Sequence, residues 1–156
     1  MQSNMKKGFT LIEMLTVVAI FFILSALVVT PFVLLEREKA LSGSALILKT
    51  ALSEARSKTV AAQGGGRFGV HAVSGEKVLT LFQGDSYNEG DSDNVSISLN
   101  SYVEISSVDL DGASPFVLFE KISGETNQSG EIVLVGNQFG DLRYATVTIF
   151  SSGVVE

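Results

Sequence analysis

The sequence contains no cysteine and a single histidine, His71, among its 156 residues. Disulfide bonds, cysteine-ligated zinc and a Cys–His nucleophile are therefore excluded. A Ser–His–Asp triad would depend on His71, which falls inside an expected strand, so we expect no enzymatic activity and no cofactor. Because Val70 and Ala72 take the apolar positions of that strand, we predict that the side chain of His71 is exposed.

Basic residues are scarce in the second part of the chain. Residues 63–156 carry thirteen acidic and four basic side chains, a net charge of −9, whereas residues 1–62 have a net charge of +3. The four basic residues are Arg67, Lys77, Lys121 and Arg143. Because binding to a nucleic acid backbone needs clustered lysine and arginine, this composition disfavours a nucleic acid partner.

Charge is almost absent from residues 9–35, where Glu13 is the only charged side chain. This run of about 27 residues exceeds the roughly 20 that a helix needs to cross a bilayer. A cleaved secretory signal is disfavoured, because the run is about twice the usual length and no small-residue cleavage site follows it. Two interpretations stay open: a plain membrane anchor with Lys6 and Lys7 on the cytoplasmic side, or a helix that later packs into a polymer.

Glu13 has two possible roles at the start of this helix. Thr10-Leu-Ile-Glu13 fits the capping-box pattern, in which the first and fourth residues satisfy each other's backbone amides. An acidic residue in the first turn also suits the helix dipole. Alternatively, the carboxylate of Glu13 binds a cation of another subunit, and both charges are then buried in an apolar assembly.

The segment Lys6–Glu13 resembles the class III signal of type IV pilins and type II secretion pseudopilins. The resemblance implies a leader at residues 1–8, cleavage by prepilin peptidase between Gly8 and Phe9, and N-methylation of Phe9. It also implies that Glu13, as the fifth residue of the mature chain, pairs with the N-terminal amine of a neighbouring subunit. Met5 offers a second possible start, which would shorten the leader.

The helix is expected to continue as an amphipathic extension over residues 36–63. Pro31 predicts a kink, and Gly43 marks a weak point, because proline removes a helical hydrogen bond and glycine is a poor helix former. Apolar and small residues recur at three- and four-residue steps and predict one buried face: Leu41, Ala45, Leu48, Leu52, Ala55, Thr59 and Ala62. The glycines of residues 64–66 are expected to end the helix.

The pattern beyond these glycines is typical of short strands. Strands are expected at residues 67–73, 78–82, 95–99, 102–108, 116–122, 131–135 and 142–150, followed by a tight turn and a short last strand. The predicted fold class is α+β, with a long N-terminal helix, membrane-spanning in its first half (9–35), and an antiparallel β domain over residues 64–156. This order, with Ala55-Arg56 in the helix and Gly153 in the last turn, resembles the GspH/FimT group of minor pseudopilins and minor pilins. That resemblance implies two sheets packed against the helix.

Residues 83–94 form an expected loop that is rich in oxygen-bearing side chains. Asp85, Glu89, Asp91 and Asp93 could gather around a cation such as calcium. The loop departs from the EF-hand pattern, because the twelfth position counted from Asp85 is Ser96 rather than glutamate. We therefore expect a solvated acidic loop, with weak cation binding as the alternative.

The resemblance implies a structural subunit of a type II secretion pseudopilus or a type IV pilus. Its partners would be other pilins or pseudopilins, prepilin peptidase and the inner-membrane assembly platform. It would be a single-pass protein of the bacterial inner membrane, with its β domain outside the cytoplasm, that enters a periplasmic or extracellular filament. Two alternatives are a DNA-binding minor pilin used in DNA uptake and a monomeric anchored domain.

Overall fold

The computed structural model describes residues 9–138 and 141–156, except for the side chains of residues 27–35, 37, 38 and 138. The chain forms two compact units, Met1–Glu36 and Arg37–Glu156, which are described separately. The expected leader, with Gly8, lies outside the described residues.

The helix α1 includes residues Leu11–Val60 and crosses the boundary between the units. The predicted weak point at Gly43 does not interrupt it. The neighbouring Ser44 is buried, and its Oγ accepts a hydrogen bond from the backbone amide of Asn100 at 3.2 Å. This hydrogen bond attaches the helix to the β domain next to Gly43, the position at which the helix was expected to be weak. Pro31 lies within α1, and the kink predicted there stays a prediction.

The buried face of α1 largely follows the predicted period. Its fully buried members are Ala40, Ser44, Leu48, Ala51, Leu52, Ala55 and Thr59, and Leu41 and Ala45 pack partly against them. The prediction for Ala62 was wrong. Ala62 lies beyond the helix, is exposed and has a left-handed backbone with φ of 51°. A short 3₁₀ turn, Gln63–Gly65, follows, so the glycines do end the helix.

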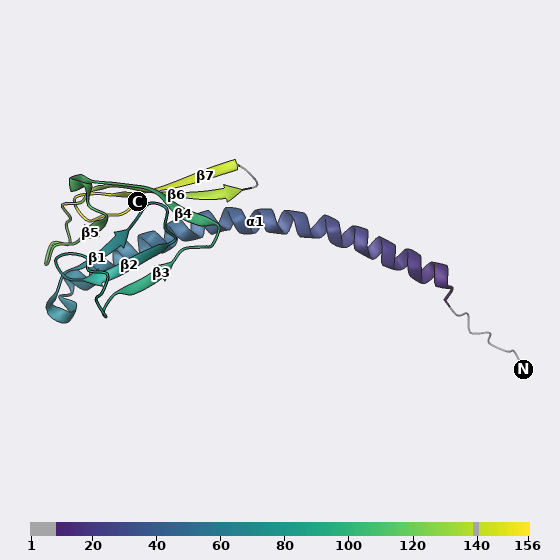
Figure 1. The fold of residues 1–156 in the computed structure, drawn as a ribbon, viewed down its shortest axis with the longest axis horizontal. Coiled ribbons are helices and arrows are strands. Elements are labelled where there is room, and N and C mark those ends of the chain that lie inside the picture. Colours follow the sequence, from purple (N-terminus) through teal and green to yellow (C-terminus); the bar gives the residue numbers. More distant parts are fainter. Residues whose placement is uncertain (1–8, 139–140) are drawn as a thin grey trace, which may run out of the picture. The chain divides into compact units, whose positions relative to one another are not determined.

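The first sheet is antiparallel, with the strand order β3-β2-β1-β5 (Figure 1). Its members are β1 (Phe68–Ala72), β2 (Val78–Gln83), β3 (Val95–Ser98) and β5 (Phe116–Leu118). The register pairs Val70 of β1 with Leu81 of β2, and both side chains are buried. Alternation therefore turns one face of the sheet towards the core, as the sequence predicted.

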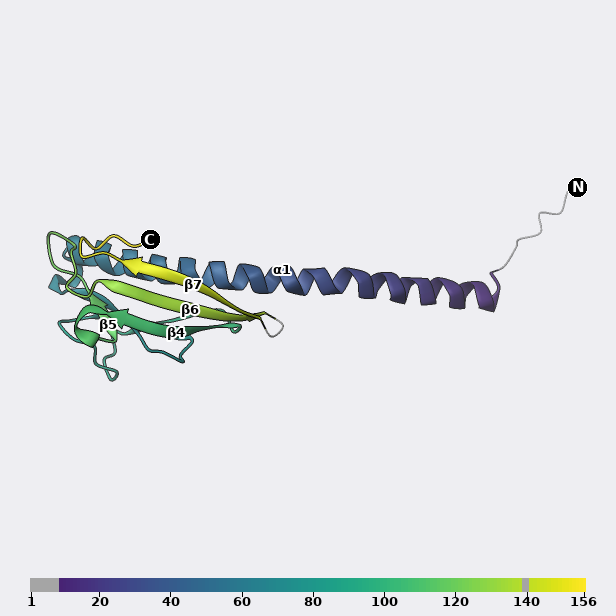
Figure 2. The ribbon, with the colours of Figure 1, turned by 90° about the horizontal axis from the view of Figure 1, so that it is seen from above.

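The second sheet has the strand order β4-β6-β7, and Figure 2 shows the three strands side by side. Its members are β4 (Val103–Leu110), β6 (Gly130–Gln138) and β7 (Asp141–Ile149). The register between β4 and β6 shifts at residues 105–107, which indicates a β-bulge. A single bridge joins Ile149 to Val155, where a short last strand was predicted.

One hydrophobic core joins both sheets to residues 40–55 of α1. Its members include Leu48 and Leu52 from the helix, Leu79 from the first sheet, and Ile105 and Leu134 from the second. All five side chains are fully buried. The prediction of an α+β fold, with a helix packed against an antiparallel domain of two sheets, is therefore confirmed.

Three strand ends differ from the predictions by more than one residue, and one of them is the end of β6, which reaches residue 138 rather than 135. The strand expected over 116–122 is shorter, because Ile122 has a φ of 72° and is 91% exposed, so the chain turns away. The strand expected to end at Val108 continues to Leu110, whose buried side chain lies opposite Gly130. Burial of one apolar side chain thus extends the strand beyond its expected end.

Candidate functional site

The start of α1 has the geometry of a capping box. The backbone amide of Glu13 donates to Oγ1 of Thr10 at 3.3 Å, and the amide of Thr10 donates to Oε2 of Glu13 at 3.5 Å. The second distance is at the long end for a hydrogen bond, and both contacts are exposed. The carboxylate of Glu13 is therefore loosely held and open to another partner.

The side chains that follow Glu13 are apolar and exposed. The large apolar residues described between Phe9 and Leu24 have exposed fractions of 50% to 83%. None of the described residues of the unit Met1–Glu36 covers these side chains, so their apolar surface is available for contact. Within the described part of the chain, no helical stretch combines the length and the apolar character that crossing a membrane requires.

Three of the four basic residues of the β domain already have partners. Arg67 binds Oδ1 of Asp85 and Oε1 of Glu120 at 2.8 and 2.6 Å, and the hydrogen bond to Asp85 raises the pKa of its guanidinium. Nζ of Lys77 and Nζ of Lys121 each donate to a backbone carbonyl. These positive groups stabilise loops of the domain rather than forming one basic surface.

The acidic loop does not gather its four carboxylates. Asp85 is bound by Arg67, and Oδ1 of Asp91 accepts a hydrogen bond from the amide of Asp93 at 3.1 Å. Across residues 9–138 and 141–156, no group of three metal-binding side chains is close enough to hold an ion. The geometry thus gives no support to the calcium alternative for Asp85, Glu89, Asp91 and Asp93.

His71 differs from the sequence prediction, because it is half-buried rather than exposed. Its imidazole stacks on the ring of Tyr87, with 3.8 Å between the centroids and 12° between the planes. Burial lowers the pKa of His71, and the negative charges of Glu76 and Glu89 raise it by a smaller amount. The stack attaches the acidic loop to β1. Sequence reasoning missed it because the two residues belong to separate segments.

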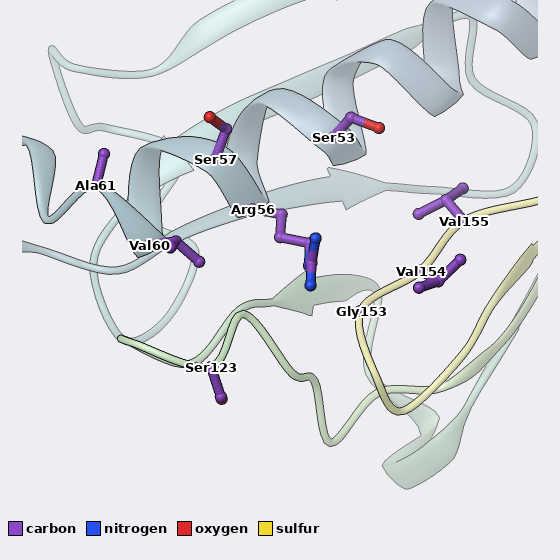
Figure 3. Close-up of a pocket in the computed structure, with 9 residues that line it drawn as sticks. All are labelled: Ser53, Arg56, Ser57, Val60, Ala61, Ser123, Gly153, Val154 and Val155. Atoms are coloured by element: carbon purple, nitrogen blue, oxygen red, sulfur yellow. The ribbon is translucent and has the colours of Figure 1, made fainter.

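Arg56 joins α1 to two turns of the β domain. Its Nε donates to the carbonyl of Gly124 at 3.0 Å, and Figure 3 shows the side chain extending from α1 towards the turn at Gly153. A Cβ at Gly124 or Gly153 would lie 2.9 Å from this nitrogen. Both glycines also have a positive φ, so the turns fit around Arg56 only without side chains. The Ala55-Arg56 pair was noted in the sequence, but its contacts were not predictable from it.

Comparison with known families gives one match, at the N-terminus. A family model described as the prokaryotic N-terminal methylation motif matches residues 3–29. This motif is a signal of type IV pilins and pseudopilins, and the matched range contains Gly8, Phe9 and Glu13. No curated protein and no solved structure matches the chain.

Proposed function

We propose that this chain is a minor structural subunit of a type II secretion pseudopilus or a type IV pilus, and that it catalyses no reaction itself. The observation that carries the proposal is the methylation motif at residues 3–29. Such a motif implies a substrate of prepilin peptidase that associates with other pilins. The minor rather than major role, and the GspH/FimT group, rest on the order of one long helix followed by strands.

The N-terminal residues have distinct roles in this proposal. Prepilin peptidase cleaves between Gly8 and Phe9, and the new amine of Phe9 is methylated. Residues 9–35 hold the subunit in the inner membrane, with the β domain outside the cytoplasm, before assembly on the inner-membrane platform. The exposed apolar side chains described between Phe9 and Leu24 support a segment that lipid or neighbouring helices must cover.

The carboxylate of Glu13 meets the amine of a neighbouring subunit in the filament. In apolar surroundings an unpaired charge is costly, and a nearby opposite charge offsets that cost. The long contact between Thr10 and Glu13 supports this role, because it leaves the carboxylate able to bind a cation without unwinding the helix. A capping role and an assembly role are therefore compatible in one residue.

A processing experiment tests the proposal. Replacing Gly8→Ala should leave the leader attached and block entry into filaments, because the peptidase requires a residue without a side chain at this position. Mass spectrometry of the protein from membranes gives the N-terminus directly. A Gly8→Ala chain that is processed and assembled like the parent protein would refute the cleavage assignment.

A second variant separates the charge of Glu13 from its capping bond. Glutamine also serves at this position of a capping box, so Glu13→Gln keeps the contact to Thr10 but removes the negative charge. We expect a processed, membrane-held protein whose incorporation into sheared filaments falls by about tenfold or more. Normal incorporation of Glu13→Gln would assign Glu13 to helix capping alone. The comparison is Glu13→Ala, which loses both the capping contact and the negative charge.

A further inference from the structure

A groove of about 590 Å³ lies beside Arg56, between the end of α1 and two turns of the β domain (Figure 3). The hydroxyl-bearing residues Ser53, Ser57 and Ser123 line it together with valines from α1 and from the C-terminal segment. None of its lining residues is acidic. Arg56 is the one charged residue among the described residues that line the groove.

The guanidinium of Arg56 is positioned but not neutralised. Its Nε is held by the carbonyl of Gly124, and this is its only hydrogen bond to the described part of the chain. Arg67, by contrast, binds two carboxylates. The two terminal nitrogens of Arg56 are therefore free to donate to a ligand from outside the molecule, and paired guanidinium donors match the two oxygens of a carboxylate.

The chain itself offers a segment with the complementary charge. Glu89, Asp91 and Asp93 are exposed, and within the described residues none of them forms an ion pair. The loop has a defined shape, because Gly90 and Asn94 each form a hydrogen bond with Asn88. The structure thus presents three exposed carboxylates on an ordered loop.

We propose that the groove at Arg56 is a carboxylate-binding site, and that its ligand is the acidic loop Glu89–Asp93 of a second copy of the chain. Because the groove and the loop are different surfaces, the contact is heterologous and can repeat from copy to copy. The inference rests on the proposed function, and it further requires that copies of this subunit lie beside one another in the filament.

Cross-linking between two single-cysteine chains tests the contact, and the absence of native cysteine removes background. The full chains Ser57→Cys and Ser92→Cys, with different tags, are co-expressed and oxidised in membranes. We expect disulfide-linked pairs that contain one chain of each kind. As a control, Ser106→Cys replaces Ser57→Cys, because Ser106 is an exposed residue of β4 outside the groove, and it should give background yield.

A charge variant tests the role of Arg56 without removing its bond to Gly124. Ser53→Glu places a carboxylate three residues before Arg56 on the same helix, where the two side chains are neighbours. We expect this change to lower the cross-link yield by about tenfold, whereas Ser42→Glu, an exposed change of equal charge, should not lower it. An unchanged yield with Ser53→Glu would overturn the role of Arg56.

A further cysteine variant distinguishes failure of this inference from failure of the proposed function. Thr50→Cys lies on the exposed face of α1 and should link helices of neighbouring copies in a filament. If Thr50→Cys forms dimers but the Ser57 and Ser92 variants do not, the groove proposal is wrong and the filament proposal stands. If none of the three forms dimers while the leader is also unprocessed, the proposed function is wrong.

Discussion

At the scale of single residues, buried polar groups fix the position of α1 against the β domain. Thr59 is fully buried, and its Oγ1 accepts a hydrogen bond from the amide of Phe68 at 2.8 Å. This amide is the first of β1, so one hydrogen bond joins the last turn of the helix to the start of the sheet. An amide left without a partner in the core would cost free energy.

We expect Thr59→Val to lower the free energy of unfolding by about 1–3 kcal/mol, because valine keeps the shape but leaves the amide of Phe68 unsatisfied. Thr50→Val is the matched control, since Thr50 is exposed and its hydroxyl bonds only to Leu46 of the same helix. Urea denaturation of the full chain in detergent measures both. Equal effects of the two substitutions would contradict the assignment.

At the scale of elements, two turns of the β domain depend on glycine for different reasons. Gly153 has a φ of 75°, and a Cβ there would overlap the carbonyl oxygen of Gly124. Gly75, in the turn between β1 and β2, has a φ of 85° but no atom within 4 Å of the same position. The first glycine is required by conformation and by packing, and the second by conformation alone.

This difference predicts unequal effects of alanine at the two positions. Gly75→Ala should cost about 1–2 kcal/mol, the usual penalty of a left-handed residue with a side chain. Gly153→Ala should cost more than Gly75→Ala and should also loosen the C-terminal segment, because the turn must move away from Gly124. Thermal denaturation gives the order of stability, and hydrogen exchange at Val154 and Val155 reports the local change. Equal melting temperatures and equal exchange would refute this account.

At the scale of the whole molecule, the distribution of charge disfavours the DNA-uptake alternative. The net charge of residues 63–156 is −9, and the side-chain nitrogens of Arg67, Lys77 and Lys121 are engaged within the domain. Association with DNA depends on releasing counterions from phosphates that lysine and arginine neutralise. This domain has few lysine and arginine side chains that could neutralise the phosphates of DNA.

We therefore expect the full chain in detergent to retain no more double-stranded DNA on a filter at low salt than a detergent blank. Low salt favours electrostatic binding, so it is the most permissive condition. A basic DNA-binding protein serves as the positive control. Salt-sensitive retention of DNA by this chain would instead favour the role in DNA uptake.

Much of the fold follows from local patterns in the sequence. The period of small and apolar residues identified the buried face of α1, and alternation identified β1 and β2. Ala62 was assigned to that face in error, because a three- to four-residue period says nothing about where a helix stops. The capping geometry of Thr10 and Glu13 was also predictable, since both residues lie within one helical turn.

The amino-acid sequence by itself carries the N-terminal signal, because that signal is contiguous: two lysines, Gly8, Phe9 and one carboxylate in an apolar run. Only the tertiary structure decided the order of the strands, the stacking of His71 on Tyr87 and the groove at Arg56. These features join segments that are far apart in the chain. Their geometry depends on how the whole core packs, and local periodicity does not specify that packing.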